Sequence, residues 1–124
     1  MNLGLEEKVA VITGGSDGIG KAAALSMSRE GVRVAIAARD QSKLDAAVAD
    51  ISDQTQNRVL GISTDVRDED SVRSLISQVV DEWGGIDILV NNAGTSSTSR
   101  LEDMSNEIMT ADIELKVYGA VYGT

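Results

Sequence analysis

The sequence predicts an α/β fold built on a parallel sheet, and three observations lead to this prediction. Four short apolar stretches rich in β-branched residues begin near Val9, Val32, Val59 and Ile86. A segment with helical periodicity separates each stretch from the next. Apolar runs of this kind are typical of parallel strands buried on both faces. Strict alternation of strand and helix indicates βαβ units with right-handed crossovers, and the 124 residues form a single domain.

The first half of the chain contains two strands and two helices in this prediction. The first strand runs from Val9 to Thr13. The helix after it begins near Gly18 and ends at Gly31, because glycine commonly terminates helices. The second strand covers residues 32–38. The next helix carries four apolar residues spaced as on one helical face: Leu44, Ala47, Val48 and Ile51.

The second half continues the alternation. The third strand covers residues 58–66, and Asp68 is suited to cap the next helix. That helix carries an apolar stripe through Val72, Leu75, Ile76, Val79, Val80 and Trp83. Gly84 and Gly85 end it, and the fourth strand begins at Ile86 and leads into a turn at residues 91–94.

A last helix is predicted from Ser105 to near the end of the chain. One apolar stripe contains Ile108, Ala111, Leu115 and Tyr122, and another contains Met109, Ile113, Val117 and Val121. A helix that is apolar on two sides is usually covered on two sides. We therefore expect the sheet to cover one side, and further chain or another subunit to cover the other.

Composition and charge exclude several classes of function. The chain has 11 basic and 20 acidic residues, a net charge of −9, which disfavours nucleic-acid binding. No apolar run approaches the ~18 residues of a membrane span, and we expect no membrane partner. The absence of cysteine and histidine predicts no metal site. The start resembles no secretory signal, so the cytoplasm is the expected compartment.

Three glycines, Gly14, Gly18 and Gly20, lie where the first strand ends and the helix begins. A helix N-terminus at the carboxyl edge of a sheet favours a phosphate, and glycine lets the backbone approach it. The spacing G-x-x-x-G-x-G differs from the commoner dinucleotide pattern G-x-G-x-x-G and lacks the Lys-Ser/Thr of a P-loop. The pattern favours phosphate binding, with an ordinary glycine turn as the alternative.

The residue after the second strand indicates which dinucleotide is preferred. Dinucleotide-binding folds often place an acid about 20 residues past the glycines, where it holds the ribose 2′-hydroxyl. Arg39 occupies this neighbourhood here. A guanidinium would hold a 2′-phosphate that a carboxylate would repel. Arg39 therefore predicts NADP(H) in preference to NAD(H), with a surface arginine as the alternative. The adjacent Asp40 weakens the positive field but could cap the next helix.

Three motifs together resemble those of the classical short-chain dehydrogenase/reductase family. TGGSDGIG at residues 13–20 resembles the family's T-G-x-x-x-G-[IL]-G loop, and NNAG at residues 91–94 resembles its signature after the fourth strand. Asp65-Val66 is similar to the pair that faces the adenine. The resemblance covers residues 5–124. It implies a Rossmann-type doubly wound parallel sheet with strand order 3-2-1-4 in this part, the later strands being absent.

The resemblance also implies which residues bind the dinucleotide. The loop residues that it assigns to the cofactor are Gly14, Gly15, Ser16, Asp17, Gly18, Ile19 and Gly20, most of them around the pyrophosphate and its ribose. Arg39 would hold the 2′-phosphate, and Asp65 and Val66 would flank the adenine. The residues expected along the central and nicotinamide-side ribose are Asn91, Ala93 and Gly94. Thr13 would tie the first strand to the fourth.

Two departures from the family pattern concern catalysis. The family uses a Ser and a Tyr-x-x-x-Lys after a fifth strand, and this sequence contains neither arrangement. Tyr118 and Tyr122 have no lysine four positions on and are expected to pack. Lys116 stands where the family has the Asn of N-x-x-G. It is the candidate catalytic residue, as a donor in a proton relay, with a helix-surface lysine as the alternative. Residues 1–124 are predicted to be inactive alone.

The predicted function is the cofactor-binding part of an NADP(H)-dependent oxidoreductase acting on a small-molecule carbonyl or alcohol. The full-length form is expected to be a homo-oligomer. The alternative is a stand-alone dinucleotide-binding module without catalytic activity. A phosphoacceptor receiver domain is disfavoured, because Thr13-Gly14-Gly15 offers no acidic cluster. The chain is expected to be truncated at its carboxyl end. An open apolar edge through Ile86, Ile88 and Val90 should make the isolated fragment associate.

Overall fold

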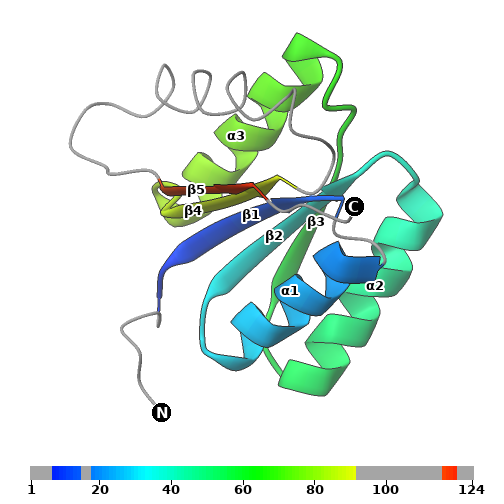
Figure 1. Ribbon diagram of the computed structural model, residues 1–124, viewed down its shortest axis with the longest axis vertical. Coiled ribbons are helices and arrows are strands. Elements are labelled where there is room, and N and C mark those ends of the chain that lie inside the picture. Colours follow the sequence, from blue (N-terminus) through cyan, green and yellow to red (C-terminus); the bar gives the residue numbers. More distant parts are fainter. Residues whose placement is uncertain (1–6, 15–17, 92–115, 120–124) are drawn as a thin grey trace.

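The described part of the chain folds into one parallel sheet with helices on both faces (Figure 1). The computed structural model describes residues 7–14, 18–91 and 116–119, the last four as backbone only. The strands are β1 (Val9–Thr13), β2 (Arg33–Ala38), β3 (Val59–Ser63), β4 (Ile88–Asn91) and β5 (Lys116–Gly119). The helices are α1 (Gly18–Arg29), α2 (Gln41–Thr55) and α3 (Glu69–Trp83). The strand order is β3-β2-β1-β4-β5, which confirms the predicted order 3-2-1-4 of the first four.

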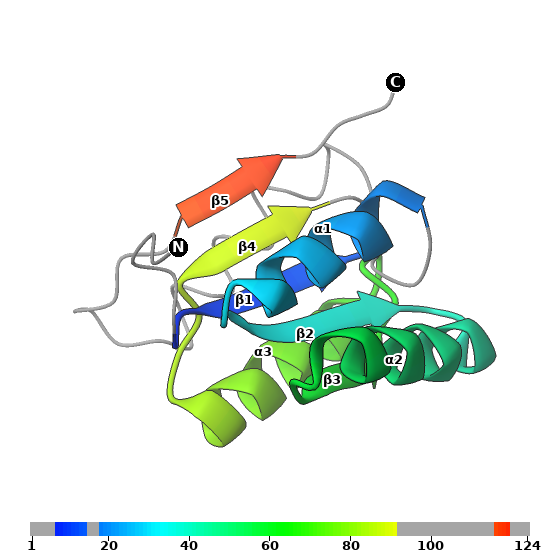
Figure 2. The same cartoon turned by 90° about the horizontal axis from the view of Figure 1, so that it is seen from below.

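The sheet is the middle of three layers. Helices α1 and α2 cover one face and α3 covers the other, and Figure 2 shows the twist of the sheet between them. Successive strand residues point to opposite faces. In β1, Val9 and Val11 pack with α3, whereas Ala10 and Ile12 pack with α1 and α2. Strands buried on both faces have no polar side to display, which explains their continuous apolar sequence.

The ends of the helices follow the predicted capping residues. Asp40 caps α2 by accepting a hydrogen bond from the backbone N–H of Lys43 at 3.1 Å. Asp68 caps α3 by accepting from the N–H of Asp70 at 3.0 Å. Gly84 ends α3 with φ of +86°, a left-handed conformation that suits glycine. These contacts confirm Asp68 and Gly84 as helix boundaries and give Asp40 its expected capping role.

The third strand is shorter than its predicted span of residues 58–66. It ends at Ser63, because the backbone turns away from the sheet within the next few residues. Thr64 still donates its N–H to the Ala38 carbonyl at 2.8 Å. The N–H of Asp65 instead donates to the Ser71 hydroxyl at 2.9 Å. The polar residues after Ser63 therefore form a loop that leads into α3.

The prediction of a helix from Ser105 to near the end is wrong for residues 116–119. These residues form β5, parallel to β4, with Ile88 opposite Lys116 and Asn91 opposite Gly119. Val117 and Tyr118 are β-branched and aromatic residues that favour strands. Pairing with β4 gives their backbone hydrogen-bond partners, so tertiary structure overrides the helical spacing. The other residues of the two predicted stripes lie outside the described part of the chain.

The expected open edge at β4 is also wrong. β5 covers the side of β4 that faces away from β1. In the register of this pair, Val90 lies opposite Tyr118. Ile86, Ile88 and Val90 are all buried. The statement that the later strands are absent is corrected in the same way, since a fifth strand is present.

Candidate functional site

The register of the sheet brings several strand ends to one edge. Thr13 lies opposite both Ala37 of β2 and Asn91 of β4. Ala38 lies opposite Ser63, the last residue of β3. The residues that follow β1, β2 and β3 therefore meet beyond this carboxyl edge, which is where open α/β sheets bind their ligands.

A hollow of about 400 Å³ opens at this edge, and we call it the carboxyl-edge hollow. Its lining comes from the three segments that follow β1, β2 and β3: Gly14, Ala37, Ala38, Arg39, Asp40, Lys43, Thr64, Asp65, Val66 and Arg67. Four residues predicted from the sequence to bind the cofactor, Gly14, Arg39, Asp65 and Val66, thus come together around one cavity.

Gly14 and Gly18, between β1 and α1, both have backbone conformations that favour glycine. Gly14 has φ of +69°, and its N–H donates to the Ala37 carbonyl at 2.7 Å. Gly18 begins α1 with φ of +58°, although a Cβ there would meet open space. Glycine at position 18 therefore serves conformation rather than close packing. The predicted cofactor residues Gly15, Ser16 and Asp17 lie outside the described residues.

The first turn of α1 exposes one apolar side chain. Ile19 is 60% exposed, and no other large hydrophobic side chain is exposed in the part of the chain that the structure describes. Gly20 is buried on the inner side of the same turn. Both residues lie at the amino end of α1, whose unpaired N–H groups and positive dipole end favour an anion.

A buried hydrogen bond joins β1 to β4 beside the glycine turn. The Thr13 hydroxyl donates to Oδ1 of Asn91 at 2.8 Å, and both residues are at most 2% exposed. This contact confirms that Thr13 ties the first strand to the fourth. Asn91 ends β4 at the carboxyl edge, whereas the predicted ribose contacts Ala93 and Gly94 lie outside the described residues.

Lys116 is not brought to this edge by its backbone. It begins β5 opposite Ile88, whereas the carboxyl edge is marked by Asn91 opposite Gly119. The backbone of Lys116 thus lies at the amino end of the strand pair. Its role in a proton relay stays a prediction.

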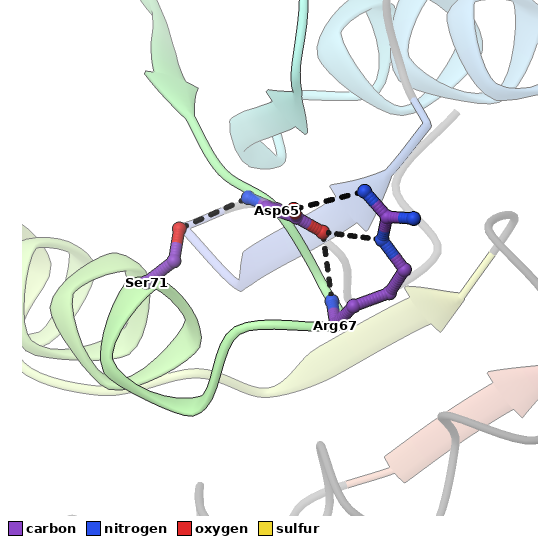
Figure 3. A network of polar contacts seen from close by, with 3 residues as sticks. All are labelled: Asp65, Arg67 and Ser71. Carbon is purple, nitrogen blue, oxygen red and sulfur yellow. Dashed lines mark hydrogen bonds and ion pairs between the residues drawn. The ribbon is translucent and has the colours of Figure 1, made fainter.

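The loop after β3 is organised around the Asp65 carboxylate, as Figure 3 shows. Oδ1 of Asp65 accepts hydrogen bonds from the Arg67 backbone N–H at 2.9 Å and from Nε at 3.1 Å. Oδ2 accepts from Nη2 of Arg67 at 3.2 Å. The side-chain and then the backbone hydrogen bonds of Arg67 lower the pKa of Asp65, and the charge of Arg39 lowers it further. The carboxylate in turn raises the pKa of Arg67.

The carboxyl-edge hollow is more basic than the rest of this acidic chain. Its lining includes three cations, Arg39, Lys43 and Arg67, and two carboxylates, Asp40 and Asp65. Sequence reasoning did not find Lys43 or Arg67. The available signals were the place of Lys43 in the first turn after the Asp40 cap, and the place of Arg67 directly after Asp65-Val66.

Two classes of site are not found in the described part of the chain. Residues 7–14, 18–91 and 116–119 contain no group of three acidic, histidine or cysteine side chains that could hold a metal ion. Among the helices of this part, none combines the length and the apolar character needed to cross a bilayer.

Comparison with known proteins identifies the family. The family model for short chain dehydrogenases matches residues 8–124, which is nearly the whole chain. The chain therefore belongs to the short-chain dehydrogenase family, and its sheet is of the Rossmann type. This result confirms the resemblance drawn from the glycine-rich loop, Asp65-Val66 and the NNAG turn.

Individual relatives agree with this assignment. An uncharacterized oxidoreductase of Staphylococcus saprophyticus is 36% identical over 118 residues, which are 95% of this chain and 50% of that protein. The chain thus spans about half the length of the curated relatives it matches. The structure of L-sorbose reductase from Gluconobacter frateurii, complexed with NADPH and L-sorbose, is similar with a TM-score of 0.72 and 41% identity. That match covers 77% of this chain and 36% of the reductase.

A further solved structure matches a larger share of the chain. The 2-keto-3-deoxy-D-gluconate dehydrogenase from Streptococcus agalactiae is similar with a TM-score of 0.82 and 26% identity. The match covers 93% of this chain and 51% of the dehydrogenase. The relatives therefore include oxidoreductases of different names on one shared fold.

Proposed function

We propose that this chain is the cofactor-binding part of an NADP(H)-dependent oxidoreductase. The reaction is hydride transfer between the nicotinamide and a small-molecule carbonyl or alcohol. Membership of the short-chain dehydrogenase family supports the reaction class. The similarity to a reductase that was solved with NADPH supports the cofactor. The proposal also includes the cytoplasm as compartment and a homo-oligomer as the full-length form.

The position of Arg39 carries the preference for NADP(H). Arg39 follows directly after β2 and lines the carboxyl-edge hollow together with Asp65 and Val66. Within the described part of the chain, no carboxylate forms an ion pair with Arg39, so its guanidinium is available to an anion. A 2′-phosphate accepts two parallel hydrogen bonds from such a group, whereas a 2′-hydroxyl gains much less.

The other residues of the hollow suit the adenosine half of the same cofactor. Lys43, like Arg39, comes from the segment that follows β2, and it brings a second positive charge to the hollow. Gly14 and Gly18 shape the backbone for the pyrophosphate, together with Gly15, Ser16, Asp17, Ile19 and Gly20. Asp65 and Val66 flank the adenine, and Asn91, Ala93 and Gly94 contact the ribose nearer the nicotinamide. When bound, the dinucleotide supplies the hydride or accepts it.

The test compares two cofactors on the full-length protein. Dissociation constants for NADPH and NADH are measured for the wild type, for Arg39→Asp and for a control, Arg33→Asp. Arg33 is the first residue of β2, and Arg39 follows the last residue of that strand. The Arg33→Asp variant therefore changes the net charge by the same amount but at the other end of the strand, away from the hollow. Loss of one charge-assisted contact costs ~1.5–3 kcal/mol, which is about 10- to 150-fold in affinity.

We expect the wild type to prefer NADPH, Arg39→Asp to lose that preference and Arg33→Asp to keep it. Equal affinities of the wild type for NADH and NADPH would contradict the role of Arg39. Tight cofactor binding by a full-length protein that turns over no carbonyl or alcohol would instead favour the binding module without catalytic activity.

A further inference from the structure

Arg67 is held in a fixed orientation at the rim of the carboxyl-edge hollow. Its backbone N–H, Nε and Nη2 all bond to the carboxylate of Asp65, at distances of 2.9, 3.1 and 3.2 Å. The loop that carries the carboxylate is itself anchored, because the Asp65 N–H donates to Ser71 of α3. Figure 3 shows the Arg67 side chain folded back onto Asp65. A side chain that is usually flexible is therefore pre-organised here.

The geometry leaves the flat faces of the Arg67 guanidinium accessible. Among the described residues, the side-chain contacts of the guanidinium engage one edge, since Asp65 accepts from Nε and Nη2. The Arg67 side chain is 73% exposed. It lines both the carboxyl-edge hollow and a second hollow formed by Arg39, Ser63, Thr64, Asp65, Arg67 and Ser71. Arg67 thus lies where the two hollows adjoin.

We propose that Arg67 is the platform on which the adenine ring of the dinucleotide stacks. A guanidinium face binds an aromatic ring through stacking and cation–π attraction, and a fixed orientation reduces the entropy lost on binding. Asp65 acts as the positioning residue that sets the plane of the platform. This inference rests on the proposed function, and it names a contact that the sequence motifs did not include.

The charges around the loop favour stacking over a phosphate contact for Arg67. A phosphate that bonded to the Nε–Nη2 edge would have to displace the Asp65 carboxylate. A phosphate elsewhere on the group would lie close to the charge of that carboxylate. Arg39 has no ion-pair partner among the described residues, so it remains the better phosphate ligand. Stacking requires only the open face of Arg67, which the carboxylate does not cover.

The test uses two variants of Arg67 in the full-length protein, with NADPH and NADH as probes. Arg67→Gln removes the charge, and Arg67→Lys keeps the charge but removes the flat face. We expect both variants to weaken the binding of NADPH and the binding of NADH by the same factor, about 3- to 30-fold. The ratio of the two affinities should stay at its wild-type value. Arg39→Gln should change that ratio instead.

Arg58→Gln is the matched control, because Arg58 is also an exposed arginine in an ion pair, with Glu82 at 2.7 Å. Arg58 directly precedes β3, at the amino ends of the strands and away from the carboxyl edge. The variant should therefore leave both affinities unchanged. Weaker binding of NADPH alone, with Arg67→Lys retaining wild-type affinity, would overturn stacking in favour of a phosphate contact. Unchanged affinities in both Arg67 variants would also overturn it. Failure of the wild type to bind either cofactor would instead refute the proposed function.

Discussion

Single residues connect the two helices on one face of the sheet. Lys21 of α1 forms an ion pair with Asp50 of α2. Gln54 donates to the same carboxylate at 3.0 Å and accepts from Arg29 at 3.2 Å. These contacts lie at the partly exposed seam between α1 and α2, so water weakens the charge interactions there.

The ion pair predicts a dependence of stability on pH. The hydrogen bond from Lys21, followed by that from Gln54, lowers the pKa of Asp50 below 3.8. A carboxyl group whose pKa is lower in the folded state stabilises the fold at any pH above its pKa in the unfolded chain. That contribution is lost as the pH falls through the pKa of the folded state. Asp50→Asn should therefore be less stable than the wild type at pH 7, and the difference should begin to shrink below about pH 4 and disappear once the pH is below the folded-state pKa of Asp50. Urea unfolding across this range measures the difference.

Asp53→Asn, on the exposed side of the same helix, serves as the control. At pH 7 it should lose less stability than Asp50→Asn, because none of the ion pairs in the described part of the chain includes Asp53. A constant difference between Asp50→Asn and the wild type down to acid pH would show that the Asp50 charge is not the cause.

At the residue scale, motifs on the backbone could be predicted and side-chain pairings could not. The Asp68 cap follows from residue type and position, whereas the tie between Thr13 and the fourth strand was implied by the family resemblance. The Asp65–Arg67 clamp depends on where a loop turns and which rotamer an arginine adopts. A short spacing of opposite charges is common in exposed loops, so it did not single out Arg67. Lys43 was missed because its place in the site depends on the hollow beside α2, which the sequence does not show.

At the scale of elements, the packing of α2 on β3 depends on a missing side chain. A Cβ on Gly61 would lie 2.6 Å from Cγ2 of Val48 and 3.2 Å from Cγ of Leu44. The Val48 methyl is close to its own backbone and its χ1 is restricted, so it cannot swing away at little cost. Gly61 therefore sets how closely the helix approaches the edge strand.

This contact predicts the effect of Gly61→Ala. Alanine lowers the entropy of the unfolded chain and would stabilise by about 0.4–1 kcal/mol if it fitted. The clash with Val48 is larger, because overpacking costs ~1–3 kcal/mol. We expect a net loss in the free energy of unfolding, measured by urea denaturation. In the double variant with Val48→Ala the loss should be smaller than the sum of the two single losses. Additive losses would contradict the contact.

The elements themselves were predictable as far as β4 but not beyond it. A short continuous apolar run located β1, and the helical spacing of apolar residues located α2 and α3. The segment at residues 116–119 contains Val117 and Tyr118, which suit a strand, within a helical spacing of apolar residues. Local pattern favoured a helix, whereas the unpaired edge of β4 required a partner. That long-range need decides the structure and is invisible in a short window of sequence.

At the scale of the whole molecule, the site exists because the sheet is parallel. Parallel pairing places the ends of β1, β2 and β3 at one edge, and α1 and α2 begin from the same edge. Two separate apolar cores, one on each face, fix this arrangement, and the charged residues of the edge belong to neither core. The loops at the edge can therefore carry charges such as Arg39 and Arg67 without disturbing the core.

In the proposed function, the carboxyl-edge hollow binds an adenosine whose 2′-oxygen carries a phosphate. The most direct measurement is calorimetric titration of the full-length protein with adenosine 2′,5′-bisphosphate and with adenosine 5′-monophosphate, which differ only by that phosphate. We expect the bisphosphate to bind at least about tenfold more tightly, because it adds one charge-assisted phosphate contact. Equal affinities for the two nucleotides, or tighter binding of the monophosphate, would contradict it.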